Sequence, residues 1–147
     1  MTKDFYQISL KVILKNKQGE VLILQAVDNG SYAGYYDLPG GRINTNEFKV
    51  PLSKIIEREV FEEIGKIKYK LNEKPVAVGR HLIPRKYSSL KKDVHCFYAF
   101  FKADYISGEI KISEEHMGYK WVDLNTIKLE NYFKSGILEG VKMYLSK

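Results

Sequence analysis

The segment from Leu52 to Ile64 constrains the fold more than any other part of this sequence. Pro51 stands where a helix can begin, and Gly65 stands where one can end. Between them a large apolar residue recurs every four positions, at Leu52, Ile56, Val60 and Ile64. The segment therefore predicts an amphipathic helix with one side in a hydrophobic core.

Three glutamates, Glu59, Glu62 and Glu63, lie within an arc of about 100° on this helix, at the border of the apolar stripe. Like charges at helical spacing repel, and burial at the edge of a core adds a desolvation cost. A bound cation would relieve both, and carboxylate oxygens suit Mg²⁺ or Mn²⁺ better than Zn²⁺. The alternative is a solvated helix face on which Arg58 and Lys66 balance the charges.

The rest of the chain predicts an α+β fold with a mixed β-sheet packed between helices. A β-hairpin is expected at 9–27, with its turn at 16–19, and a closing helix is expected at 131–145. Further strands are expected at 35–38, 67–71, 76–83, 94–101 and 119–122. The length of 147 residues suits one domain, residues 1–147, at about 150 residues per domain.

Composition limits the cellular setting and the partners. The one cysteine, Cys96, cannot form a disulfide within the chain, and no secretory signal or run of about 20 apolar residues is present. We therefore expect a cytoplasmic protein with no membrane partner. The net charge of +6 suits a phosphate-bearing partner without identifying one.

Residues 38–66 resemble the Nudix box, whose pattern is G-x5-E-x7-R-E-U-x-E-E-x-G-U with U a bulky apolar residue. The resemblance rests on the run Leu38-Pro39-Gly40-Gly41, on Glu47 six positions after Gly41, and on the run Arg58-Glu59-Val60-Phe61-Glu62-Glu63-Ile64-Gly65. Two features depart from the pattern. Ten residues instead of seven separate Glu47 from Arg58, a three-residue insertion that leaves the place of Glu47 open, and Lys66 replaces the last apolar residue.

The resemblance implies an α/β/α sandwich and a metal-dependent active site. By position in the box, Glu59, Glu62 and Glu63 are expected to bind Mg²⁺, or alternatively Mn²⁺, with the Gly40 carbonyl as a further ligand. Arg58 corresponds to the arginine that orients the glutamates. These ions would neutralise a pyrophosphate so that water can attack phosphorus.

The resemblance further implies a metal ligand or a general base in a loop before the strand that carries a tryptophan. Glu115 lies six residues before Trp121 and is the leading candidate, with Glu114 as the second choice. The alternative is an acidic turn capped by Ser113.

Candidate substrate-binding residues lie outside the acidic helix. Arg42 follows the two glycines, where a basic side chain can meet phosphate; the alternative is a solvated loop arginine. Tyr36 could stack on a nucleobase, as could Tyr32 and Tyr35; the alternative is tyrosines half-buried beside a sheet edge. Arg80 and Arg85 belong to a stretch, residues 79–92, with five basic residues and no acidic residue before Asp93. That stretch could hold substrate phosphates, contact RNA, or form an exposed hairpin tip.

The resulting hypothesis is a pyrophosphohydrolase that acts on a nucleoside diphosphate linked to another moiety. A nucleoside triphosphate and an ADP-ribose-like compound are the leading substrates. The alternative is a catalytically weak nucleotide- or RNA-binding module on the same fold. The sequence leaves open whether the protein forms a homodimer.

Overall fold

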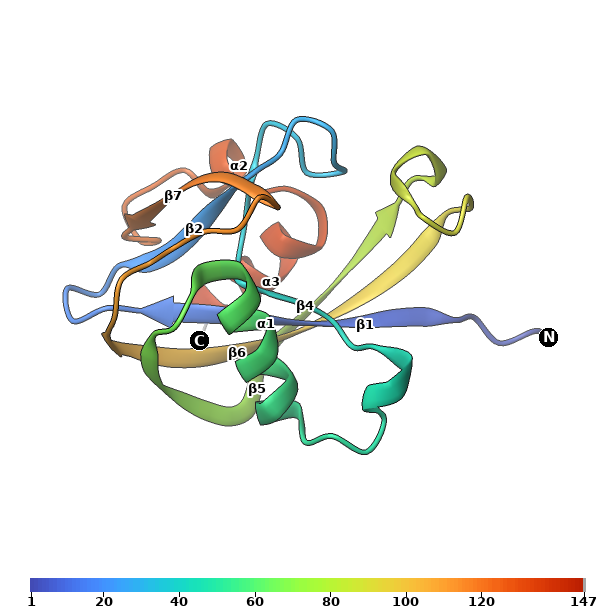
Figure 1. The fold of residues 1–147 in the computed structure, drawn as a ribbon. Coiled ribbons are helices and arrows are strands. Elements are labelled where there is room, and N and C mark those ends of the chain that lie inside the picture. The colour runs from blue at the N-terminus through green and yellow to red at the C-terminus, as the bar shows by residue number, and fades with distance from the viewer. Residues whose placement is uncertain (147) are drawn as a thin grey trace.

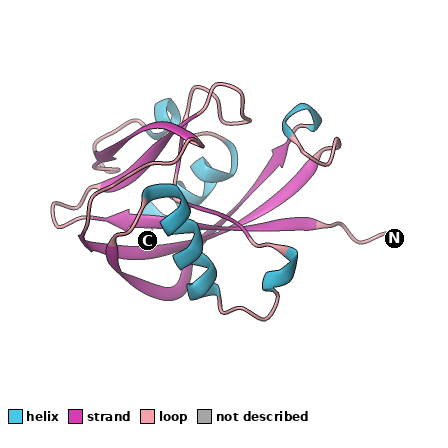
Figure 2. Cartoon of the chain, in the orientation of Figure 1, coloured by secondary structure: helices cyan, strands magenta, loops and turns pink. Residues whose placement is uncertain are grey.

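A seven-stranded mixed sheet forms the middle layer of the computed structural model (Figures 1 and 2). The structure describes residues 1–146, so Lys147, the last residue of the expected domain, lies outside the described residues. The strands are β1 (Tyr6–Lys15), β2 (Val21–Ala26), β3 (Tyr36–Asp37), β4 (Gly40–Arg42), β5 (Lys68–Ile83), β6 (Val94–Ser107) and β7 (His116–Val122). The main path runs β3-β2-β1-β6-β5, with β4 paired to β1 and β7 paired to β2. Strands β1 and β6 are parallel, and the other pairs are antiparallel.

Helices cover both faces of this sheet, as Figure 1 shows for α1 (Leu52–Ile64) and α3 (Ser135–Leu145). The alternation of side chains along β1 explains the two layers, because successive residues of a strand point to opposite faces. Leu10, Val12 and Leu14 pack in one core cluster with α1. Ile13 packs in the other cluster, with α3. The arrangement confirms the predicted α+β fold with a mixed sheet between helices.

The acidic helix has the predicted bounds, Leu52–Ile64. Its buried apolar face differs from the expected stripe, because Leu52 is 46% exposed and Ile55 is buried in its place. The buried stripe therefore begins at Ile55, three residues after Leu52. Gly65 ends the helix at a φ of 91°, a conformation that favours glycine, and its N–H donates to the Phe61 carbonyl.

Two expectations about secondary structure are wrong. The strands expected at 67–71 and 76–83 form one strand, β5, because register shifts on either side of Pro75 absorb the irregular residues between them. The closing helix expected at 131–145 is two helices, α2 (Leu129–Tyr132) and α3. Extended backbone at Phe133 and Lys134 separates them and lets the Phe133 side chain enter the core. Among residues 1–146, no helix has the length and hydropathy to cross a membrane.

Helix α3 lies close to the sheet because glycines stand at the contact. A Cβ on Gly136 would come within 2.5 Å of the Arg80 carbonyl oxygen. A Cβ on Gly140, one turn later, would overlap the ring of Phe100. The close approach fixes the start of α3, including Ser135, against β5.

We expect Gly140→Ala to destabilise the protein by about 1–3 kcal/mol, because overpacking against the buried Phe100 ring outweighs the gain in helix propensity. Urea denaturation followed by circular dichroism measures the change. Gly30→Ala is the control, since a Cβ there meets Val27 Cγ2 at 3.6 Å, an ordinary contact. Equal stability of the two variants would contradict this account of α3 packing.

Candidate active site

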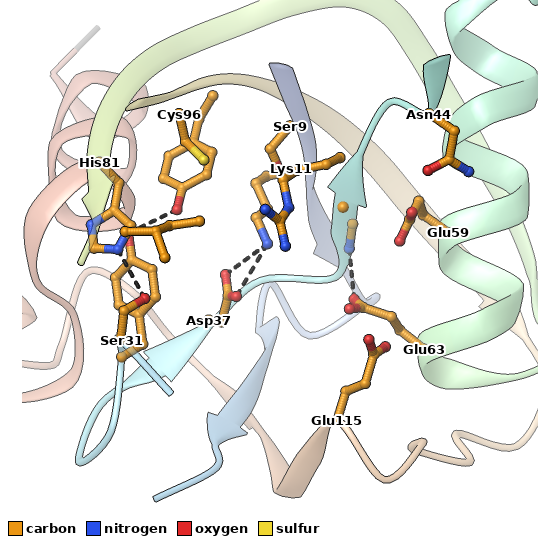
Figure 3. Close-up of a pocket in the computed structure, with 16 residues that line it drawn as sticks. Ser9, Lys11, Ser31, Asp37, Asn44, Glu59, Glu63, His81, Cys96 and Glu115 are labelled. Atoms are coloured by element: carbon orange, nitrogen blue, oxygen red, sulfur yellow. Dashed lines mark hydrogen bonds and ion pairs between the residues drawn. The ribbon is translucent and has the colours of Figure 1, made fainter. Parts of the chain in front are cut away.

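A pocket of about 350 Å³ opens beside α1, and Figure 3 shows the side chains around it. Strands β1, β3, β4, β5 and β6, helix α1, the loops before β3 and β7 and the segment after β4 all contribute to its walls. The lining residues are Ser9, Lys11, Ser31, Tyr32, Asp37, Gly40, Gly41, Arg42, Asn44, Glu59, Glu63, His81, Ile83, Cys96, Tyr98 and Glu115. Of the residues that the Nudix resemblance marked, Gly40, Glu59, Glu63 and Glu115 come together here.

The two glycines of β4 bring the carboxylates of α1 against the sheet. Gly40 has a φ of 132°, and its N–H donates to Glu63 Oε1 at 2.9 Å. A Cβ on Gly41 would occupy the position of the Glu59 carboxylate. The Leu38-Pro39-Gly40-Gly41 run therefore shapes a space in which both carboxylates approach the backbone of β4.

Arg58 ties the acidic residues together on the outer side of α1. Its guanidinium donates to Glu47 through two hydrogen bonds of 2.7 Å, to Glu59 at 2.6 Å and to Glu62 at 3.2 Å. Glu47 therefore reaches Arg58 in spite of the three-residue insertion. It is held in a short 3₁₀ turn, Thr45–Glu47, where its carboxylate also accepts the Asn44 N–H at 2.8 Å. The hydrogen bonds from Arg58 lower the pKa of Glu47.

The carboxylates that face the pocket are buried and crowded. Burial raises the pKa of Glu63 to about 8, with Asp37 and Glu115 adding to the effect and Lys11 and the Gly40 N–H opposing it. Burial also raises the pKa of Glu59, against the opposing effect of Arg58. Both glutamates thus lie where negative charge is costly without a further cation.

This donor set fits a hard divalent cation. The acidic oxygens of Glu59, Glu63 and Glu115 all face the pocket in Figure 3, and such oxygens are the ligands that Mg²⁺ prefers. Glu62 lies outside the pocket lining, with its side chain 49% exposed and paired to Arg58. Among residues 1–146, no three acidic, histidine or cysteine side chains are already close enough to hold an ion as they stand. Holding one requires side-chain rotation, which Arg58 restrains for Glu59 and Glu62.

A buried ion pair, which the sequence analysis did not anticipate, lies in the middle of the pocket (Figure 3). Lys11 Nζ lies 3.1 Å from both carboxylate oxygens of Asp37. Burial opposes the charge of Lys11, but Asp37, Glu63 and Glu59 together raise its pKa, so the ammonium stays charged. The signal available in the sequence was a lysine inside the apolar run of residues 8–14.

The end of the pocket away from the carboxylates is neutral and polar. The ring of His81 stacks on Tyr32 at 4.3 Å between centroids, and its two nitrogens hydrogen-bond to Ser31 Oγ at 3.0 Å and Ser135 Oγ at 2.8 Å. The Tyr32 and Tyr98 hydroxyls share a hydrogen bond of 3.0 Å. Burial lowers the pKa of His81 to about 4, so this ring is uncharged near pH 7.

The candidate substrate-binding residues are divided between the pocket and the surface. Arg42 lines the pocket, and its guanidinium donates to Gln7 Oε1 at 2.7 Å. Tyr36 lies outside the lining and packs against Tyr132, with ring centroids 5.7 Å apart. Arg80 and Arg85 also lie outside it, and Arg85 belongs to the tip of the projecting β5–β6 hairpin (Figure 1).

We expect the buried, neutral His81 to make stability fall in acid. The unfolded chain takes up a proton near pH 6.5, while the folded chain does so only near pH 4, so between these values the unfolded state holds more protons. Lowering the pH from 6.5 to 4 should therefore reduce the free energy of unfolding more in the wild type than in His81→Asn. Urea denaturation across this range measures both slopes, and equal slopes would contradict the prediction.

Comparison with known proteins finds relatives in sequence and in fold. Nucleoside triphosphatase NudI of Escherichia coli O139:H28 (strain E24377A / ETEC) is 25% identical over 111 residues, which cover 75% of this chain and 77% of that protein. The crystal structure of the MutT protein from Methanosarcina mazei Go1 matches with a TM-score of 0.68 and 24% identity, over 98% of this chain and 94% of that one. An ADP-ribose pyrophosphatase from Streptococcus suis 89-1591 matches with a TM-score of 0.59 and 14% identity, over 95% and 87% of the two chains.

Most of the chain, and not only the segment that resembles the Nudix box, matches a family model. The family model described as NUDIX domain matches residues 5–139, which include all seven strands, α1, α2 and the lining of the pocket. The match confirms the resemblance inferred from the Nudix box. This chain belongs to the NUDIX domain family.

Proposed function

We propose that this protein hydrolyses the pyrophosphate bond of a nucleoside diphosphate linked to another moiety, with a divalent metal ion as cofactor. The observation that carries the proposal is the convergence of Glu59, Glu63 and Glu115 on one pocket, beside the two glycines of β4. Burial raises the pKa of Glu63, and Asp37 and Glu115 add to the effect, so a cation bound here would stabilise its charged form. A surface charge cluster would have no need of such burial.

In the proposed site, Glu59, Glu62, Glu63 and the Gly40 carbonyl hold Mg²⁺, for which Mn²⁺ could substitute. The bound ion supplies charge neutralisation for the diphosphate. Arg58 acts as a positioning residue, since it bonds to Glu47, Glu59 and Glu62 and so limits their rotamers.

The proposed reaction is a hydrolytic displacement at phosphorus. A water oxygen forms a bond to one phosphorus of the anhydride, and the bond from that phosphorus to the bridging oxygen breaks. The bridging oxygen leaves with the departing phosphate group. The proton lost by the water passes to a carboxylate of the pocket, and we assign this role, or that of a further metal ligand, to Glu115, which lines the pocket from the loop before β7.

Nucleoside triphosphates are the leading substrate class, and ADP-ribose-like compounds are the second. The activity in the name of the NudI relative supports the first class. The neutral end of the pocket, at His81, Tyr32 and Ser31, carries no charge that would oppose an uncharged group such as a nucleobase. Arg42, at the rim, is suited to bind a phosphate.

The test incubates the purified protein, with Mg²⁺ or Mn²⁺, with nucleoside triphosphates, ADP-ribose, dinucleoside polyphosphates and capped RNA. Anion exchange separates the products. We expect cleavage of at least one compound and its loss when the metal is removed by EDTA. Nucleotide binding without turnover under either metal would support the binding-module alternative. Binding of RNA that weakens steeply with salt would assign the basic hairpin tip to RNA instead.

We expect Glu59→Gln, Glu62→Gln and Glu63→Gln each to lower kcat by at least about 100-fold, because each removes a negative charge from the proposed metal site. Glu57→Gln on the same helix is the matched control, since Glu57 is 63% exposed and pairs with Lys54 at 3.3 Å. It should keep wild-type turnover. Loss of activity in the control, or its retention in all three variants, would contradict the assignment.

A further inference from the structure

Lys11 is a charged residue at a position where the fold needs none. On β1, Leu10, Val12 and Leu14 face α1, while Ser9, Lys11 and Ile13 face the opposite side. Ile13 belongs to the apolar core on that side, and an apolar residue at position 11 would extend it. Lys11 is instead 6% exposed and lines the pocket. Burying an ion pair is weak evidence of a role in stability, because apolar residues of similar volume often stabilise as well or better.

Asp37 holds the Lys11 ammonium but leaves donors for another group. Both carboxylate oxygens of Asp37 lie 3.1 Å from Lys11 Nζ. An ammonium has three N–H donors, and no other described side chain forms a hydrogen bond with this one. The remaining donors are available within a pocket that is open to a ligand.

Lys11 lies between two different parts of the pocket. Figure 3 places Lys11 and Asp37 between the carboxylates of Glu63 and Glu115 and the neutral end at His81. A diphosphate compound that spans the pocket would pass this point between its metal-bound phosphate and its uncharged moiety. A fixed cation at this point would complement the negative charge of the phosphate oxygens.

We propose that Lys11 Nζ binds a phosphate oxygen of the substrate, on the phosphate that joins the metal-bound end to the moiety held near His81. This inference rests on the proposed function and deepens it by adding a phosphate-binding residue outside the Nudix box. Asp37 is the positioning residue, since it fixes the ammonium in the pocket. The substrate then meets two cations of different kinds, the divalent ion on the α1 side and Lys11 on the β1 side.

The test uses imidodiphosphate, a pyrophosphate mimic whose bridging nitrogen resists hydrolysis, and measures its binding by isothermal titration calorimetry with Mg²⁺ present. We expect Lys11→Met to weaken this binding by at least about 10-fold, as for a lost charge-assisted hydrogen bond. Binding of Mg²⁺ alone, measured separately, should be unchanged or tighter, because a positive charge near Glu63 and Glu59 is removed. Lys15→Met, the same change farther along β1, is the matched control and should bind both as the wild type does.

Each outcome separates this inference from the proposed function. Wild-type binding of imidodiphosphate by Lys11→Met would overturn the role of Lys11 and leave the metal site intact. Parallel loss of Mg²⁺ and imidodiphosphate binding would overturn it too, because Lys11 would then act only through the carboxylates. Failure of the wild-type protein to bind either probe would overturn both proposals. If Lys11→Met does not fold, as judged by circular dichroism, the double variant Lys11→Met, Asp37→Asn removes the unpaired carboxylate and takes its place.

Discussion

The close approach of β4 to α1 is the constraint on which the rest of the site depends. Gly40 adopts a φ of 132° and donates its N–H to Glu63 Oε1 at 2.9 Å, and Gly41 leaves room for the Glu59 carboxylate. A Cβ on Gly41 would overlap the Glu59 carboxylate of the helix, and a Cβ on Gly40 would overlap the backbone of β1 at Leu10. The contact turns two helix glutamates toward a pocket that the sheet, the loop before β3 and the loop before β7 complete. The backbone conformation of these two glycines thus determines where the Glu59 and Glu63 carboxylates lie.

Charge balance organises the surroundings of this contact. Arg58 binds Glu47, Glu59 and Glu62 on the outer side of the helix, while Lys11 and Asp37 pair within the pocket. These cations leave Glu63 with a raised pKa, so the protein groups by themselves do not satisfy its charge. A divalent ion would supply positive charge beside Glu63, and Lys11 presents a cation to a diphosphate, so the same geometry supports both proposals.

The sequence predicted the elements that are specified locally and failed where packing between distant segments decides. Helix α1 has the expected bounds because Pro51, Gly65 and a four-residue repeat are local signals. The break between α2 and α3 has no such local signal. It occurs because the Phe133 side chain packs into a core that is built largely from the strands of the sheet. Packing between distant segments also decides the length of β5, because pairing with β6 keeps the chain extended on both sides of Pro75.

For the site, the sequence predicted which residues take part, and the tertiary structure decided which of them lie together. The spacing of the glutamates and glycines indicated the Nudix box. Residues that share a helix turn or a tight loop are neighbours in any fold, so their spacing in the sequence is enough to recognise them. Lys11 joins Asp37 across 26 residues, and His81 joins Ser31 and Ser135 across 50 and 54. Such contacts depend on sheet order and on the close packing of α3, which no local pattern encodes. The family therefore follows from the sequence. The buried Lys11 ammonium and the neutral end of the pocket form only when the strands assemble into the sheet.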